Sequence, residues 1–379
     1  MSQSSPLPAR RRRWPIFAPL GLVLILAVGW SIFWYVAAQR AEETIEGWRA
    51  REAQSGRVYT CGRQTVGGYP FRIEVNCTNA VAEVRNVGAP LRFKLANIHL
   101  AGQIYDPTLL ISEFVGPLAV GDIGQPASVM AYWKLAQASA RGTPRAPERL
   151  SLVLDEPRFD RVAGTSQQTV GSAKALEMHG RIASGTVTDN PVIDVVFRVV
   201  SGLAPTVHPL LGAPTDADVS ITLRGLKDFA PQSWAQRLRE LQARDGRLDV
   251  TRARIQQGDV LATAAGLLGL TSAGNLEGQL DVTIAGIDKV LKSLSVDATT
   301  VQGGASGQLG AALGALDRIS PMLGNFARQN AGPAIAAGLR ALGKQTTLEG
   351  REATTLPLRF TDGAVSLGPI PLGRVVPLF

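Results

Sequence analysis

The stretch GGYPFRIEVNC, residues 67–77, is the segment that best indicates the fold. After two glycines, apolar residues alternate with polar ones, and a period of two sends successive side chains to opposite faces of a β-strand. We therefore expect a strand with one apolar face, lying over a groove. The residues of this stretch that we assign to the groove are Tyr69, Phe71, Ile73 and Val75.

The segments on either side extend this pattern. Residues 57–65 and 69–77 are predicted to form a hairpin, and 79–87 a third strand. LRFKLANIHLAG (91–102) alternates and then slips phase to Ile98 and Leu100, which indicates a β-bulge. Three further residues are assigned to the groove: Leu91, Phe93 and Leu95.

The second half of the chain interrupts its strands with helical segments. Residues 230–246 carry Trp234, Leu238 and Leu241 on one helical face and end at Gly246. The other predicted elements are strands at 247–255, 259–268 and 276–285, a helical region at 287–343 and a hairpin at 354–369 around Asp362–Gly363. The expected fold is mainly β (α+β), a long curved antiparallel sheet with a few packed helices.

The N-terminal part predicts a membrane anchor. Residues 16–36 form an uncharged run whose length matches the roughly 20 residues that cross a bilayer as a helix. Arginines before the run favour a cytoplasmic N-terminus, and aromatic residues stand near its far end. The anchor residues are Arg10, Arg11, Arg12, Arg13, Trp30, Trp34 and Tyr35. A cleaved signal peptide is the alternative, because VAA at 36–38 resembles a cleavage site, although the run is longer than a usual signal core.

The expected organisation follows from this anchor and from a composition rich in Arg, Ala and Gly, which is typical of bacteria. The protein would be a single-pass inner-membrane protein with its C-terminal part in the periplasm. The predicted parts are a cytoplasmic N-terminus (1–15), a transmembrane helix (16–36), a helical stalk (37–56) and a periplasmic β-rich domain (57–379) with helical insertions near 230–245 and 287–343.

The two cysteines, Cys61 and Cys77, are predicted to form a disulfide, since an exported pair meets an oxidising compartment. A two-residue turn at Gly67–Gly68 would place the two sulfurs on opposite faces. The bond therefore requires a loop of about three to five residues that brings the cysteines into facing or diagonal register. Two buried free thiols are the alternative.

Motifs for catalysis or metal binding are absent from the sequence. His99, His179 and His208 fit no local ligand spacing. GLRALGKQ (338–345) has the spacing of a phosphate-binding loop but lacks the required Ser or Thr. Basic residues outside the N-terminal arginines are scattered, which disfavours a nucleic-acid partner. We expect a protein that is not an enzyme and that holds neither cofactor nor metal.

Three segments carry a family resemblance: GGYPFRIEVNC, residues 248–286 and residues 356–373. Together they resemble the alphaproteobacterial family known as domain of unknown function 2125, over the whole exported part. More distantly, 248–286 is similar to AsmA-like envelope proteins, which are anchored in the inner membrane and use long curved sheets as apolar grooves for phospholipid. The chain is much shorter than the large AsmA-like transporters, so the resemblance does not imply a bridge across the periplasm.

The function that we expect is binding or moving lipid through an apolar β-groove in envelope maintenance. The partners would be the lipid bilayer, a phospholipid or another acyl-chain ligand, and other envelope proteins. The alternative is an envelope scaffold that recruits a protein and carries no ligand. Alternation alone also leaves open whether the sheet lines a groove or encloses an ordinary core of Leu, Val and Ala.

Overall fold

The structure is a computed structural model that describes residues 14–85, 90–143, 146–207, 209–230, 232–286, 343–368 and 370–379. The arginines at 10–13, His208 and nearly all of the predicted helical region 287–343 lie outside these described residues. Within them the protein is mainly β, with a long N-terminal helix, a short second helix and one large open antiparallel sheet.

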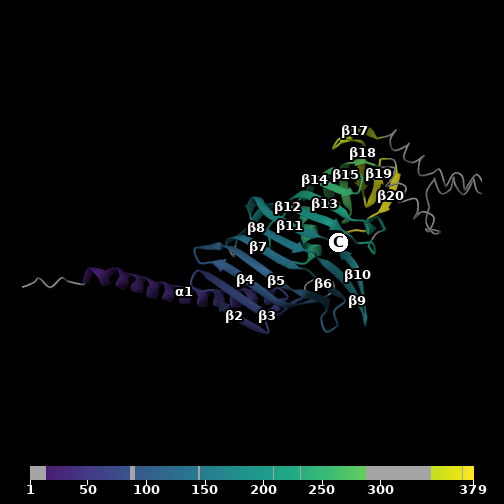
Figure 1. Cartoon of the computed structure of the whole chain (residues 1–379). Helices are drawn as coiled ribbons and strands as arrows, with labels where there is room; N and C mark the ends of the chain where they lie inside the picture. Colours follow the sequence, from purple (N-terminus) through teal and green to yellow (C-terminus); the bar gives the residue numbers. More distant parts are fainter. Residues whose placement is uncertain are drawn as a thin grey trace, which may run out of the picture.

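The first helix, α1 (Trp14–Gln54), runs through both the predicted membrane span and the predicted stalk without a break. It extends away from the sheet at one end and lies beside the first strands at the other (Figure 1). The segment Phe17–Gln54 is long and apolar enough to cross a membrane, with a mean hydropathy of 2.1 in its most apolar window, none of which is buried. A single-pass anchor is compatible with this helix.

The twenty strands of the described residues form one sheet. The first ten are β1 (Arg57–Thr60), β2 (Arg63–Gly67), β3 (Arg72–Val84), β4 (Leu91–Gln103), β5 (Asp106–Asp122), β6 (Val129–Tyr132), β7 (Leu135–Thr143), β8 (Ala146–Asp155), β9 (Arg158–Ala163) and β10 (Ser166–Ser172). The others are β11 (Ala175–Thr186), β12 (Asp189–Gly202), β13 (Thr215–Arg224), β14 (Arg247–Gln257), β15 (Val260–Leu270), β16 (Leu276–Ala285), β17 (Lys344–Leu348), β18 (Arg351–Thr361), β19 (Ala364–Leu367) and β20 (Ile370–Arg374). A short 3₁₀ turn, Pro209–Gly212, precedes β13.

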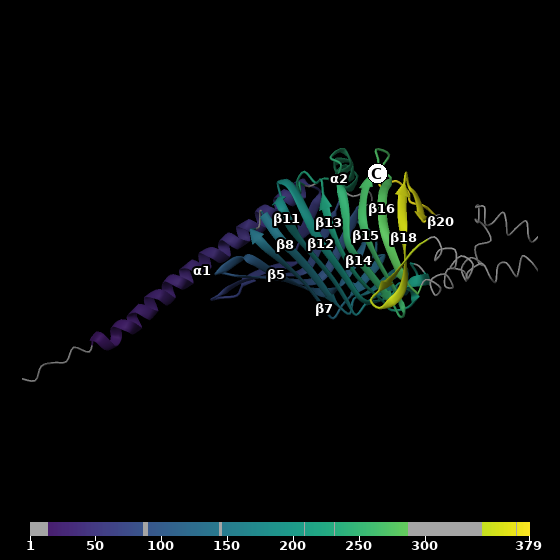
Figure 2. The same ribbon diagram turned by 90° about the horizontal axis from the view of Figure 1, so that it is seen from above.

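The strands follow one another as a meander. Both β1 and β2 pair with β3, and the sheet continues through β4, β5, β7, β8, β11, β12, β13, β14, β15, β16, β18, β19 and β20. A branch of β6, β9 and β10 joins at β5, and β17 joins at β18. The view from above shows β8 to β18 crossing the direction of β5, so the sheet twists strongly along its length (Figure 2), as right-handed strand twist accumulates in open sheets.

Several predicted elements are confirmed. Where a bulge was predicted in 91–102, the pairing of β4 with β5 shifts register between Leu95 and Asn97, and the extra residue lies in β5, between Val115 and Leu118. The C-terminal hairpin turns at Asp362 and Gly363, with φ of +48° and +78°, the positive values that a tight hairpin turn requires. The prediction of a separate third strand at 79–87 was wrong, because β3 runs without interruption from Arg72 to Val84. Asn79 lies within this strand although its φ is +49°.

The short helix α2 (Trp234–Ala243) confirms the helical prediction at 230–246. Ser233 caps its N-terminus by accepting a hydrogen bond from the Gln236 amide, and the Gln236 side chain reaches back to the Ser233 amide. Leu238 and Leu241 are buried in a cluster with Leu226, against partly buried residues of the sheet and the C-terminal Phe379. Helix and C-terminus therefore lie together at one end of the strands (Figure 2).

Candidate functional site

One face of the sheet is apolar across twelve strands. The register of the ladder places residues of neighbouring strands opposite one another, on the same face. The first apolar row consists of Val75, Leu100, Ser112, Ala138, Leu152, Met178, Phe197, Val219, Ala253, Ala264, Val282 and Leu356. Ser112 is its only polar member. A row with one polar member in twelve forms only if the apolar residues of each strand lie opposite the apolar residues of its neighbours.

A second apolar row lies two residues along each strand, or three along β14, and contains no polar side chain. It consists of Ile73, Gly102, Leu110, Ala140, Leu150, Gly180, Val195, Ile221, Val250, Gly266, Leu280, Leu358 and Leu367. We refer to these two rows as the apolar rows, and to the surface that carries them as the apolar face.

The opposite face is polar over the same strands. The adjoining row there consists of Asn76, His99, Glu113, Gln137, Val153, Glu177, Arg198, Asp218, Arg254, Thr263, Thr283 and Thr355. Val153 is its only apolar member. Arg198 lies between two carboxylates, at 3.5 Å from Glu177 and 3.2 Å from Asp218. This row is suited to water, and the two apolar rows are not. Exposed apolar side chains also occur on the polar face, outside the row or within it: Ile111, Val115, Leu135, Val153 and Leu267.

Parts of the apolar face are covered by other elements. Gln64 lies opposite Cys77 and accepts a 2.6 Å hydrogen bond from Arg49 of α1, so α1 packs over the first strands on this side. The cluster around α2 covers Ile193 and Leu223 at the other end of the strands. Leu356, in the first apolar row near the last edge of the sheet, is only 1% exposed.

The middle of the apolar face is open. The side chains exposed there are Leu150 (55%), Met178 (44%), Phe197 (36%) and Ile255 (45%). Ile255 joins the others because it lies opposite Ala217 and Ala262, one row along the same face. We call these four residues the open strip. Leu150, Met178 and Phe197 lie on the adjacent strands β8, β11 and β12, and β13 separates them from Ile255. Single exposed apolar side chains are normal on a protein surface, whereas larger apolar patches are typical of interaction sites.

The predicted groove residues divide into three groups. Ile73 and Val75 are in the apolar rows, and Val75 is buried. Leu91, Phe93 and Leu95 lie beyond the phase change of β4, half-buried except for the buried Leu95. Tyr69 and Phe71 precede β3 and contact α1 instead of the rows, with exposed fractions of 55% and 60%.

The open strip was missed by the sequence-based assignment, which placed the groove at the first strands. The alternation that could have located it is present in RLSLVLD (149–155) and in VIDVVFRVV (192–200). Alternation, however, identifies only which residues share a face of one strand. Which part of that face other elements leave uncovered depends on where α1 and α2 pack.

Cys61 and Cys77 form a disulfide with their Cα atoms 5.3 Å apart. The loop from 68 to 71 has the predicted length, but the facing or diagonal register was wrong, because Cys77 lies opposite Gln64. Cys61 instead occupies a break between β1 and β2, next to Gly62, whose amide donates to the Thr78 carbonyl at 2.9 Å. The break brings the sulfur of Cys61 back toward Cys77.

Two of the predicted anchor residues within the described helix, Trp30 and Trp34, bind the start of the sheet. The indole N–H of Trp30 donates to the Pro70 carbonyl and that of Trp34 to the Arg72 carbonyl, each at 2.8 Å. Tyr35 is exposed, and its hydroxyl accepts a 3.1 Å hydrogen bond from Gln39. The sequence predicted that these aromatic residues lie at a membrane interface. Their contact with the sheet could not be predicted, because it joins residues about 40 positions apart.

The histidines of the described residues lie apart. His179 contacts Ser151 at 3.0 Å and Glu177 at 3.4 Å, and His99 contacts Asn97 at 3.0 Å. In the part of the chain that the structure describes, no three His, Cys, Asp or Glu residues come together in a way that could hold a metal ion.

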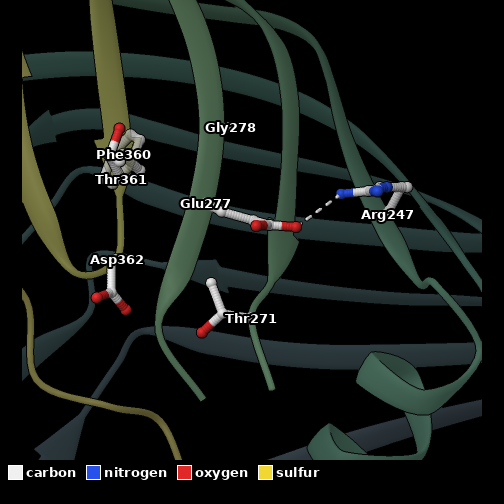
Figure 3. Close-up of a pocket in the computed structure, with 7 residues that line it drawn as sticks. All are labelled: Arg247, Thr271, Glu277, Gly278, Phe360, Thr361 and Asp362. Atoms are coloured by element: carbon white, nitrogen blue, oxygen red, sulfur yellow. Dashed lines mark hydrogen bonds and ion pairs between the residues drawn. The ribbon is translucent and has the colours of Figure 1, made fainter. Parts of the chain in front are cut away.

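A small open pocket of about 570 Å³ lies near the turns that follow β15 and β18 (Figure 3). Arg247 and Glu277 form an ion pair across it at 3.4 Å, and Asp362 and Thr271 line its rim. Each of these charged groups already has a partner. Glu277 pairs with Arg247, Arg247 also pairs with Asp245, and Asp362 accepts a hydrogen bond from Asn275. The pocket therefore offers no unpaired charge for catalysis.

Carboxylates of the polar face are held in their charged form. The Thr222 hydroxyl, which donates to Asp194 at 2.7 Å, and Arg181, at 2.8 Å, lower the pKa of the Asp194 carboxyl below its usual value. Arg85 and Arg92 similarly lower the pKa of Glu83. Hydrogen bonds and cations favour the ionised carboxylate, which is the opposite of what a general acid requires.

A family model described as "Uncharacterized protein conserved in bacteria (DUF2125)" matches residues 34–376. The chain belongs to this family. The match begins at Trp34, inside α1, and ends beyond β20, so the family includes the end of the helix together with the whole described sheet. No curated protein matches the chain.

Proposed function

We propose that this DUF2125 protein is a single-pass protein of the bacterial inner membrane that binds, or helps to move, phospholipid on the apolar face of a periplasmic sheet. It acts without catalysis, cofactor or nucleic acid, in maintenance of the cell envelope. The observation that carries the proposal is the open strip in the middle of two apolar rows that extend over twelve strands. The more distant similarity to AsmA-like proteins is in keeping with it.

The physical argument concerns water. Exposed apolar surface costs roughly 25 cal/mol for each Å² left in contact with water. On the polar face an exposed side chain such as Arg181 has an ionic partner, Asp194. Met178 and Phe197 lie opposite apolar residues in the register and are 44% and 36% exposed. An acyl chain laid on the strip gains roughly 0.8 kcal/mol for each CH₂ group that it buries there.

Photo-crosslinking tests the proposal with a matched control in the neighbouring residue. A benzophenone amino acid replaces Met178 or Phe197 in the full chain in intact membranes, and for the control it replaces Glu177 or Arg198, on the polar face of the same strands. We expect phospholipid adducts, identified by mass spectrometry, at 178 and 197 and none at 177 and 198.

Two other outcomes would reject lipid binding by the apolar face. Protein adducts at 178 and 197 would favour the alternative function, an envelope scaffold that recruits a protein partner. Equal lipid labelling at 177 and 178 would show that lipid contacts both faces alike. The apolar rows would then have no specific role in lipid binding.

A further inference from the structure

The β2–β3 turn is bound to the part of α1 that precedes the end of the uncharged run. Trp30 and Trp34 donate to the carbonyls of Pro70 and Arg72, and the Ser31 hydroxyl lies 2.9 Å from that of Tyr69. The predicted span ends at Val36 and uncharged residues continue to Gln39, so Trp34 lies at least two residues and Trp30 at least six residues before the end of the uncharged run. With a rise of 1.5 Å per residue, these indoles lie about 3 and 9 Å inside the end of the span.

Aromatic contacts reinforce the same position. The ring of Trp30 lies 6.1 Å from that of Phe71, and Trp34 meets Tyr69 edge to face at 5.5 Å. Phe71 and Tyr69 nevertheless keep more than half of their surface exposed. Trp and Tyr are enriched at membrane interfaces, where the ring meets the acyl chains and the polar atom meets water or headgroups.

The next turn along the sheet lies beside the first. The amide of Ile104, between β4 and β5, donates to the Phe71 carbonyl at 3.1 Å. Tyr105, the following residue, is 70% exposed. Two adjacent turns therefore carry Tyr69, Phe71 and Tyr105, and the first of these turns is held to Trp30 and Trp34 of α1.

We infer that these two turns, residues 68–71 and 104–105, sit in the headgroup layer of the same bilayer that α1 crosses. The inference rests on the membrane anchor of the proposed function, and the occupant it names is that bilayer. The interfacial region is roughly 5–7 Å thick on each side of the hydrocarbon core. Indoles about 3 and 9 Å inside the end of the span hold the attached turns at the inner boundary of this region, next to the acyl chains.

This position gives the apolar face a continuous connection with the membrane. Ile73, the first member of the second apolar row, follows Phe71 by two residues, and Val75 of the first row follows it by four. The second row thus begins at the headgroup layer and leads along the sheet to Leu150 of the open strip, whereas Val75 of the first row is buried. Phospholipid would reach the strip from the outer leaflet along the second row.

Fluorine NMR tests the position with two probes at opposite ends of β5. Trifluoromethyl-phenylalanine replaces Tyr105 at one end, or the exposed Gln125, beyond Asp122 at the other end. The full chain is held in nanodiscs of phosphatidylethanolamine and phosphatidylglycerol. We expect lipid with a nitroxide at carbon 5 to broaden the signal of the probe at 105 and leave that at 125 unchanged, and a water-soluble nickel chelate to do the reverse.

The inference is overturned if the nickel chelate broadens the two signals equally. That result, together with lipid adducts at Met178, would leave the proposed lipid binding intact and remove only its membrane contact. The expected NMR result without adducts at Met178 would support the contact and reject lipid binding on the strip. A Trp30→Phe, Trp34→Phe variant, which removes both indole donors, should increase nickel broadening at 105 and not at 125.

Discussion

Glu177 and Met178 are neighbours in β11, but their side chains lie in different environments. Glu177 shares the polar face with Arg198 and His179, at 3.5 and 3.4 Å. Met178 is flanked in the register by Leu152 and Phe197 and is 44% exposed. The charged side chain has ionic partners, and the exposed apolar one has none. This contrast is the observation on which the proposed lipid binding depends.

The largest expected effect separates the covered part of the apolar face from its open part. Leu356→Ala, at a 1% exposed position of the first row, should destabilise the protein by about 2–5 kcal/mol, since a buried cavity remains. The control Leu150→Ala, at a 55% exposed position of the second row, should cost less than about 1 kcal/mol. Thermal unfolding of the full chain in detergent, followed by circular dichroism, measures both. Equal losses would contradict an open strip.

The disulfide closes the first edge of the same face. A loop of about 15 residues closed by a disulfide contributes roughly 3 kcal/mol in the chain-entropy model. Cys61→Ser and Cys77→Ser should lower the melting temperature by similar amounts, and the double variant should add nothing, because either change removes the bond. Alkylation without reductant, read by mass spectrometry, should label neither cysteine of the wild type. Two labelled thiols would rule out the bond.

A smaller effect is expected where α2 covers the apolar face. Ser233→Ala removes the side chain that accepts from the Gln236 amide and should cost about 1 kcal/mol. Ser233→Asn should retain most of the stability, because Asn also caps helices well. Unfolding midpoints of the two variants provide the comparison. An unchanged midpoint for Ser233→Ala would show that α2 contributes little to the stability of this end of the sheet.

The smallest effect, on the polar face, depends on pH. The folded-state pKa of Asp194 lies below its unfolded value of about 3.9, so its stabilising contribution is present above that pH and is lost as pH falls through the folded pKa. Because the ion pair is partly exposed, Asp194→Asn should cost at most about 1 kcal/mol near neutral pH.

Acid unfolding of both proteins checks the sign of this effect. The difference between wild type and Asp194→Asn should disappear in acid, whereas the difference between wild type and Leu150→Ala should not change with pH. A penalty for Asp194→Asn that grows as the pH falls would contradict the lowered pKa. A pH-dependent penalty for Leu150→Ala would show that the two faces are coupled.

Local chemistry was enough to predict several elements. The helix at 230–246 has its apolar spacing and its serine cap, and the last hairpin has the Asp362–Gly363 pair that tolerates positive φ. The helix that is long and apolar enough to cross a membrane follows from the length of one uncharged run. These features depend on interactions within a few residues, so a single sequence contains the information that they require.

The sequence by itself determined that the strands have one apolar side, that the chain starts with a helix able to cross a membrane, and that two cysteines could meet. Only the tertiary structure decided how far the apolar rows extend, since a shift of one residue in any strand pair would have moved its apolar set to the other face. It also decided that Cys61 reaches Cys77 through a break between β1 and β2, that Tyr69 and Phe71 face α1, and that the open strip lies at Met178 and Phe197. Strand register and the packing of α1 and α2 on the sheet depend on contacts between residues far apart in the chain. Alternation along one strand does not predict such contacts.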